Sequence, residues 1–175
     1  MKRLLILILI TLSLPAYSQL DVDSLLNSVK NRPLTSIENN YALTLTGYYD
    51  DCGEFGGHLE TIEIKRIENQ LVAVLTIYKK DCFNSRGKGP KVKKSKQYTL
   101  REHHIELIQM YLSELLTKTM GYNVIGHAGR IYSARLEFVE EDLLGEDPYT
   151  RLLLKYHDIS ASWNKFDELK GELAK

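Results

Sequence analysis

The sequence predicts an α+β fold: a single antiparallel sheet of five to six strands, with one long helix packed on a face and a further helix at the C-terminus. Two features lead to this prediction. Apolar residues alternate with a period of two in several short segments, which is the spacing of a half-buried strand. Segments with helical spacing do not alternate regularly with these strands, which argues against a parallel, doubly wound sheet.

Three strands are expected before the long helix. Residues 41–49 ("YALTLTGYY") and 58–67 ("HLETIEIKRI") alternate between apolar and polar side chains. The tripeptide "ENQ" separates 58–67 from the apolar run 71–78, so these two segments predict a hairpin. Because 71–78 is apolar on both faces apart from Thr76, we expect it in a central position. A strand-like tail at 92–98 follows a lysine-rich loop.

The long helix is expected at residues 100–120, where large apolar side chains recur at helical spacing. Thr99 and Glu102 match the Thr-x-x-Glu capping box at its start, and Gly121 follows its end. Residues 131–139 and 149–157 are expected to be antiparallel strands. A short helix is expected at 21–30, and the tail predicts an amphipathic helix that carries Trp163, Phe166, Leu169 and Leu173.

Residues 1–18 have the layout of a bacterial secretory signal peptide. A positive n-region is followed by a short apolar core and by a small-residue cleavage site that ends at Ser18. The apolar core has about half the length that a membrane-spanning helix needs. We therefore expect residues 19–175 to form one globular α+β domain that is periplasmic or secreted, with no stable membrane insertion after signal cleavage.

The charge balance indicates no class of ligand for the protein as a whole. The chain carries 23 basic and 23 acidic side chains, and loss of Lys2 and Arg3 with the signal peptide leaves a mildly negative body. Such a balance gives no reason to expect a nucleic acid as partner. No cofactor-binding motif is present, so no cofactor is expected.

The chain contains two cysteines, Cys52 and Cys82. In an exported protein such a pair favours one disulfide. Cys52 follows the strand at 41–49 and Cys82 follows the strand at 71–78, so the two would meet at one end of the sheet if these strands are neighbours. The alternative is a catalytic thiolate, which would need a free cysteine and a nearby base.

Residues 48–58 ("YYDDCGEFGGH") concentrate side chains that can bind metal. Asp51, Glu54 and His58 are suitable ligands, but they match no known ligand spacing. The glycines and aspartates are equally typical of a tight connection between strands, and we favour that interpretation. If these three side chains converged with His127, which lies between glycines in a later loop, they could form the site of a small metal-dependent or hydrolytic enzyme.

The leading hypothesis is a non-enzymatic binding module that recognises an exported protein or an anionic cell-envelope polymer. Neutralising a co-exported toxin, as an immunity protein does, would be a special case. Lysines cluster between residues 79 and 96, and tyrosines recur on the predicted strands. The candidate binding residues are Lys88, Lys91, Lys93, Lys94, Tyr48 and Tyr49.

Overall fold

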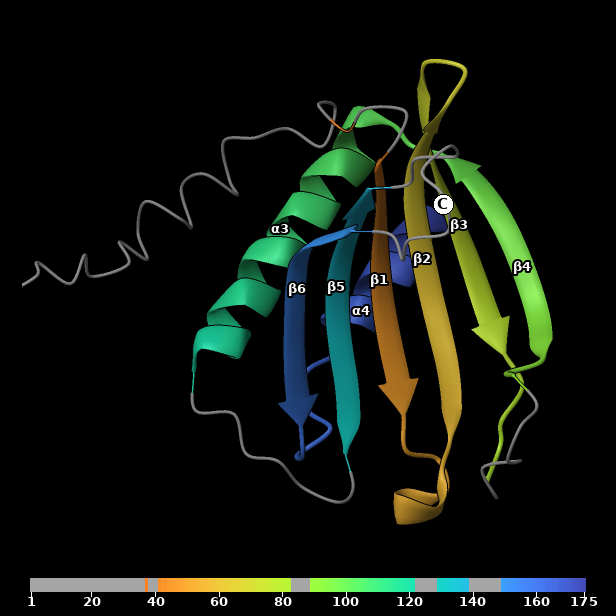
Figure 1. The fold of residues 1–175 in the computed structure, drawn as a ribbon, viewed down its shortest axis with the longest axis vertical. Coiled ribbons are helices and arrows are strands. Elements are labelled where there is room, and N and C mark those ends of the chain that lie inside the picture. Colours follow the sequence, from red (N-terminus) through yellow and green to blue (C-terminus); the bar gives the residue numbers. More distant parts are fainter. Residues whose placement is uncertain (1–36, 38–40, 83–88, 122–128, 139–148) are drawn as a thin grey trace, which may run out of the picture.

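The structure is a computed structural model (Figure 1), and the residues that it describes are 37, 41–82, 89–121, 129–138 and 149–175. The expected signal peptide at 1–18 and the expected helix at 21–30 lie outside these residues. No helix in the described ranges is both long enough and apolar enough to cross a membrane.

Six strands form one antiparallel sheet in the order β4-β3-β2-β1-β5-β6, with a long helix and a C-terminal helix, so the predicted α+β fold is confirmed. The elements are β1 (Tyr41–Tyr49), the 3-10 turn η2 (Gly53–Phe55), β2 (His58–Ile67), β3 (Gln70–Tyr78), β4 (Val92–Thr99), α3 (Glu102–Met120), β5 (Arg130–Phe138), β6 (Tyr149–Asp158) and α4 (Lys165–Leu173).

The predicted hairpin between the second and third strands is confirmed. Its turn consists of Glu68 and Asn69, which both have positive φ (47° and 66°), as the two central residues of a type I′ turn do. β3 is paired on both sides, as expected for a strand with two apolar faces, although β2 and β1 occupy the middle of the sheet.

The start of α3 differs from the prediction. Thr99 is the last residue of β4 and is still paired with Val72, so it cannot cap the helix, and the capping box predicted from Thr99 and Glu102 is wrong. The helix instead begins at Glu102, after Arg101. The backbone N–H of Arg101 donates to Nδ1 of His104 at 3.1 Å. This bond belongs to a capping box formed by Arg101 and His104 instead of Thr99 and Glu102.

Both helices pack on one side of the sheet, with α4 behind the strands and α3 along β6 in Figure 1. The core between them and the sheet is built from alternate strand residues, such as Leu45 and Ile62, which are fully buried. Phe166 of α4 approaches β1 at Gly47, where a Cβ would lie 2.9 Å from its ring. Phe166, Leu169 and Leu173 lie on the C-terminal helix as expected, whereas Trp163 precedes that helix, and all four are buried in this core.

The opposite face of the sheet carries hydroxyl side chains in register. Thr46 pairs with Thr61 of β2 and with Ser133 of β5, and the row continues through Thr76 to Ser95 of β4. This row, which we call the hydroxyl row, crosses five neighbouring strands, and Thr76 and Ser95 are in hydrogen-bond contact at 3.3 Å. This face therefore carries a polar row, unlike the apolar face that the helices cover.

Candidate functional site

The segment 50–57 forms the connection from β1 to β2, and a disulfide anchors it. Cys52 and Cys82 are bonded, with Cα atoms 5.4 Å apart, which confirms the predicted pair. The strands that precede them are not neighbours, because β2 lies between β1 and β3. The cysteines nevertheless meet, since both strands end beside the start of β2, where Gly57 and Asp81 exchange backbone hydrogen bonds of 3.0 and 2.8 Å.

A glycine is required at the end of this connection. A Cβ on Gly57 would lie 1.7 Å from the carbonyl oxygen of Tyr49, a separation that no side chain can adopt. The residue therefore lets the chain turn back closely onto β1. This geometry accounts for glycine in the motif without any bound ligand.

The metal candidates of this segment do not gather around one point. Nδ1 of His58 contacts Oδ2 of Asp51, whereas Glu54 lies exposed in η2. Among the described residues, no group of three or more His, Cys, Asp or Glu side chains could hold a metal ion. His127, the fourth candidate of the enzyme hypothesis, lies outside the described residues.

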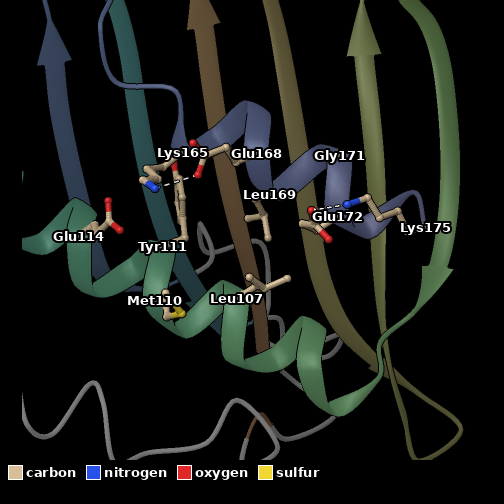
Figure 2. Close-up of a pocket in the computed structure, with 10 residues that line it drawn as sticks. All are labelled: Leu107, Met110, Tyr111, Glu114, Lys165, Glu168, Leu169, Gly171, Glu172 and Lys175. Atoms are coloured by element: carbon tan, nitrogen blue, oxygen red, sulfur yellow. Dashed lines mark hydrogen bonds and ion pairs between the residues drawn. The ribbon is translucent and has the colours of Figure 1, made fainter.

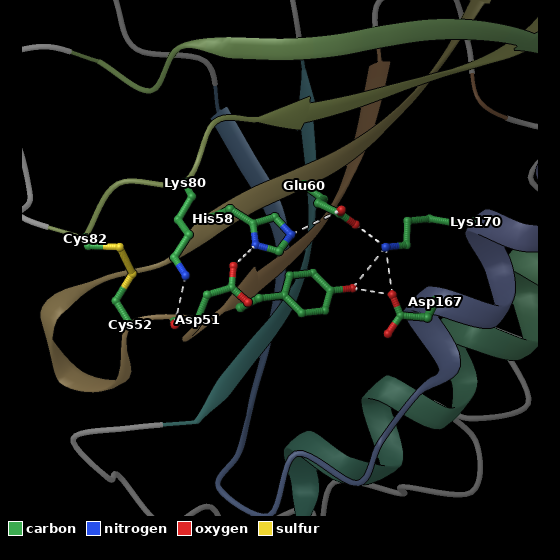
Figure 3. A network of polar contacts seen from close by, with 9 residues as sticks. Asp51, Cys52, His58, Glu60, Lys80, Cys82, Asp167 and Lys170 are labelled. Carbon is green, nitrogen blue, oxygen red and sulfur yellow. Dashed lines mark hydrogen bonds and ion pairs between the residues drawn. A yellow bond between two sulfur atoms is a disulfide. The ribbon is translucent and has the colours of Figure 1, made fainter.

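His58 instead links Asp51 to a buried carboxylate (Figure 3). Its Nε2 lies 3.3 Å from Oε1 of Glu60, which is only 5% exposed. Its ring stacks on Tyr49, with ring centroids 4.7 Å apart and planes 6° from parallel. Both ring nitrogens of His58 therefore contact carboxylates. In this arrangement neither nitrogen is available to accept a proton from a substrate.

Lys170 of α4 completes this network. Its Nζ contacts Oε2 of Glu60 and lies 2.7 Å from Oδ1 of Asp167. The same ammonium donates to the hydroxyl of Tyr49 at 3.2 Å, and that hydroxyl donates to Asp167 at 2.7 Å. Arg130 adds a longer contact of 3.9 Å to Asp167. We call Asp51, His58, Glu60, Tyr49, Asp167 and Lys170 the polar network.

Two pKa shifts follow from this packing. Burial, together with the hydrogen bond to Asp167, raises the pKa of Tyr49 well above its usual value. Burial alone would raise the pKa of Asp167, but hydrogen bonds from Lys170 and Tyr49 outweigh it and hold that pKa below its usual value. The phenol is therefore neutral and the carboxylate charged at neutral pH, which suits a satisfied structural network.

Glu60, Asp167 and Lys170 are absent from the residues selected in the sequence analysis. One signal was present, because Glu60 lies in phase with Ile62 and Ile64, which are both fully buried on the covered face. A charged residue in phase with a buried stripe predicts a partner from another element. Nothing in the sequence indicates that this partner is Lys170, 110 residues further along the chain.

A second charged region lies at the other side of the sheet, along β4. It consists of six exposed lysines, which we call the lysine edge: Lys79, Lys80, Lys91, Lys93, Lys94 and Lys96. The backbone N–H of Lys79 donates to the carbonyl of Lys91 at 2.7 Å, so the end of β3 and the approach to β4 lie side by side. Within the described ranges, none of the six forms an ion pair with a carboxylate.

For two of these lysines, the register explains the lack of a carboxylate partner. Lys94 lies opposite Ile77, and Lys96 lies opposite Leu75, so the neighbouring strand offers them no charge. Glu60 is one strand further away, opposite Ile77 on β2, and it already contacts Lys170. Lys96 lies over the ring of Tyr98 at 4.7 Å, and Lys80 donates to the backbone carbonyl of Asp51 at 3.1 Å. The lysine edge is therefore positively charged and solvated.

The structure brings together some of the predicted binding residues. Lys91, Lys93 and Lys94 lie together on the lysine edge, whereas Lys88 is outside the described residues. The two tyrosines lie on opposite faces of β1, because successive residues of a strand alternate. Tyr48 is half-buried between Leu59 and Ile131 on the open face. Tyr49 is buried in the polar network, at 7% exposure.

A groove of about 440 Å³ lies between α3 and α4 (Figure 2). Leu107, Met110, Tyr111 and Leu169 contribute its apolar lining. Charged side chains at its rim, from α4 and from the C-terminal residue that follows it, are paired with each other, Lys165 with Glu168 at 2.8 Å and Lys175 with Glu172 at 2.6 Å. These rim lysines thus contrast with those of the lysine edge.

Comparison of the chain with protein-family models, with curated proteins and with solved structures finds no match. A function for the protein must therefore be argued from its own residues.

Proposed function

We propose that this protein is an exported, non-enzymatic binding module that recognises an anionic partner through the lysine edge. The observation that carries the proposal is the gathering of six exposed lysines at one edge of the sheet without an ion-pair partner in the described part of the chain. Like charges held close together repel each other, and an anionic ligand would relieve that repulsion.

Protection of the sheet edge accounts for only part of this pattern. Lysines on an edge strand discourage pairing with another sheet, and Lys93, Lys94 and Lys96 lie on β4 itself. Lys79, Lys80 and Lys91 lie outside β4, so protection of the edge strand does not account for them. Elsewhere in the described residues several lysines that solvent reaches are paired, as the partly exposed Lys65 is with Glu63 at 2.9 Å and the exposed Lys175 is with Glu172 at 2.6 Å.

Export of the protein is supported by two independent features. The first residues have the composition of a signal peptide. The Cys52–Cys82 disulfide is of the kind that persists in oxidising compartments such as the bacterial periplasm. In those compartments, anionic envelope polymers and acidic proteins are both available as partners.

Charge reversal at the lysine edge tests the proposal. We expect the triple variant Lys91→Glu, Lys93→Glu, Lys94→Glu to bind a heparin oligosaccharide or poly-L-glutamate about 100-fold more weakly than the wild type, at about 1 kcal/mol for each lysine. Binding would be measured by isothermal titration calorimetry at low salt. The three side chains are exposed, so the variant should unfold at nearly the same temperature as the wild type.

The matched control is the triple variant Lys118→Glu, Lys155→Glu, Lys175→Glu. It makes the same change in net charge at three exposed positions outside β4. We expect this control to lose no more than about threefold in affinity, from the change in the overall field. Equal losses in the two variants would mean that only net charge matters, and the proposed site would then be wrong.

A further inference from the structure

The two edges of the sheet are covered differently. β6 lies at one edge, and α3 packs along it. β4 lies at the other edge, and its extensive contacts within the described residues are with β3 alone. Figure 1 shows no labelled element beyond β4. Residues 92–97 are all exposed, which leaves the outer side of this strand open to solvent.

An open edge strand has main-chain N–H and C=O groups that are available for hydrogen bonds with a further strand. In a β-strand, successive N–H and C=O groups point alternately to the two neighbouring strands, so those that point away from β3 have no strand to pair with. Pairing of β4 with β3 is regular from Lys94 to Thr99, and a bulge between Ile77 and Tyr78 interrupts it at Lys93. The segment 94–99 is therefore long enough and regular enough to accept one more strand.

The side chains of this segment divide by face. Lys94, Lys96 and Tyr98 lie on the side of the helices, because they pair with Ile77, Leu75 and Ala73, which alternate with the residues of the hydroxyl row. Ser95 and Gln97 lie on the open face. Residues two apart in a strand are about 7 Å apart, so Lys94 and Lys96 form a regular pair of positive charges on one face.

These lysines select among possible strands. A second copy of β4 would bring lysines opposite lysines and would be repelled. A strand with acidic residues at alternate positions would place its carboxylates opposite Lys94 and Lys96, with Cβ atoms about 5 Å apart. The charges that prevent self-pairing therefore favour an acidic strand, which is how repulsive elements produce specificity.

We propose that β4 accepts an extended acidic segment of a partner polypeptide, which adds to the sheet as a seventh strand along residues 94–99. This inference rests on the proposed function and specifies the class of partner. Main-chain hydrogen bonds would supply affinity, and the acidic side chains would supply specificity. An anionic polysaccharide could neutralise the charge of the lysines, but it has no peptide groups that could form main-chain hydrogen bonds with β4.

Two peptides separate strand addition from simple charge attraction. The first is a seven-residue peptide of alternating glutamate and threonine, and the second has the same sequence with every backbone nitrogen methylated. Both carry the same charge, but the methylated peptide cannot donate main-chain hydrogen bonds. We expect the first peptide to bind at least about tenfold more tightly and to slow hydrogen exchange of the amides at 94–99. Titrations followed by NMR give both quantities.

A charge exchange provides a second, independent measurement. The variant Lys94→Glu, Lys96→Glu should lose affinity for the glutamate–threonine peptide and gain affinity for a lysine–threonine peptide of the same length. Its matched control, Lys118→Glu with Lys175→Glu, should keep the preference of the wild type.

The possible outcomes distinguish the two proposals. If the methylated and unmethylated peptides bind equally, or if the amides at 94–99 are not protected, strand addition is wrong. If heparin still binds in a way that depends on the lysine edge, the proposed function stands without it. If neither peptide nor heparin nor poly-L-glutamate binds at low salt, both proposals fail.

Discussion

Two sets of lysines in the described residues have contrasting surroundings. Lys170 is 19% exposed, and its ammonium contacts three oxygen-bearing groups, on Glu60, Asp167 and Tyr49. Each lysine of the lysine edge is exposed and has no carboxylate within 4 Å among the described residues. The residue type is the same, but its surroundings are opposite.

The contrast indicates where charge stabilises the fold and where it is available to a partner. A largely desolvated ammonium must be matched with oxygens because desolvation is costly, so the polar network ties α4 to β1 and β2. An exposed ammonium remains hydrated and adds little to stability. We therefore expect changes at Lys170 to affect folding, and changes at the lysine edge to affect binding.

The largest expected effect concerns the disulfide, which closes the end of the sheet where the two regions approach each other. Cys52 and Cys82 are 30 residues apart, and closing a loop of this length stabilises a fold by about 3–4 kcal/mol. We expect the double variant Cys52→Ser, Cys82→Ser to lose that much free energy of unfolding in guanidinium titrations. Reduced wild type should match the variant, and a loss below about 1 kcal/mol would contradict this account.

Replacement of Lys170 tests the polar network directly. Lys170→Met leaves Glu60 buried without its ammonium partner, so we expect a loss of about 3 kcal/mol in the free energy of unfolding. The control Lys94→Met removes a lysine opposite Ile77 and should change stability by no more than about 0.5 kcal/mol. Similar values for the two variants, measured by urea unfolding, would remove the distinction between the two kinds of lysine.

A smaller effect is expected at Tyr49. Tyr49→Phe removes the hydroxyl that donates to Asp167, which should cost about 1 kcal/mol at neutral pH. Tyr78→Phe, at a half-buried position near the end of β3, is the control and should be nearly neutral. A loss as large in the control would mean that the contact with Asp167 contributes nothing specific.

The same pair of variants gives a pH dependence. Burial, and then the bond to Asp167, raise the pKa of Tyr49 above its usual 10.0, so the folded state holds this proton more tightly than the unfolded state does. Its contribution is complete below pH 10 and is lost as the pH rises further. Between pH 9 and 11, the stability of Tyr49→Phe should therefore fall less steeply than that of the wild type or of Tyr78→Phe.

The smallest effect concerns repulsion within the lysine edge. Salt screens the repulsion between like charges on the surface. Raising the ionic strength should therefore increase the free energy of unfolding of the wild type by about 0.3 kcal/mol. In the triple variant Lys91→Gln, Lys93→Gln, Lys94→Gln, this increase in stability with salt should be smaller. An unchanged salt dependence, measured from thermal unfolding curves, would mean that these lysines do not repel each other appreciably.

The sequence predicted local features more successfully than distant ones. The bounds of β1 and β2 follow from their alternation, and the hairpin from the short break at 68–70. The capping box at Thr99 was wrong because pairing with Val72 outweighs a favourable helix start, and that pairing cannot be recognised from a local pattern. A capping pattern involves only a few consecutive residues, whereas strand pairing depends on residues that are distant in the sequence.

The two candidate regions differ in the same way. Lys91, Lys93 and Lys94 could be found from the sequence because they are neighbours along the chain. The polar network could not, since Glu60 and Lys170 meet only when α4 folds back across β1 and β2. The disulfide is an intermediate case: two cysteines suggested the bond, but the intervening strand was not foreseen.

The most direct test of the central claim is to locate where an anionic ligand binds. Poly-L-glutamate would be titrated into the ¹⁵N-labelled protein at low salt while the amide resonances are followed by NMR. We predict that the largest shifts fall on residues 79–80 and 91–99, and that the resonances of α4 and Lys170 stay in place. Shifts centred on the hydroxyl row or on the groove between α3 and α4 would contradict the account.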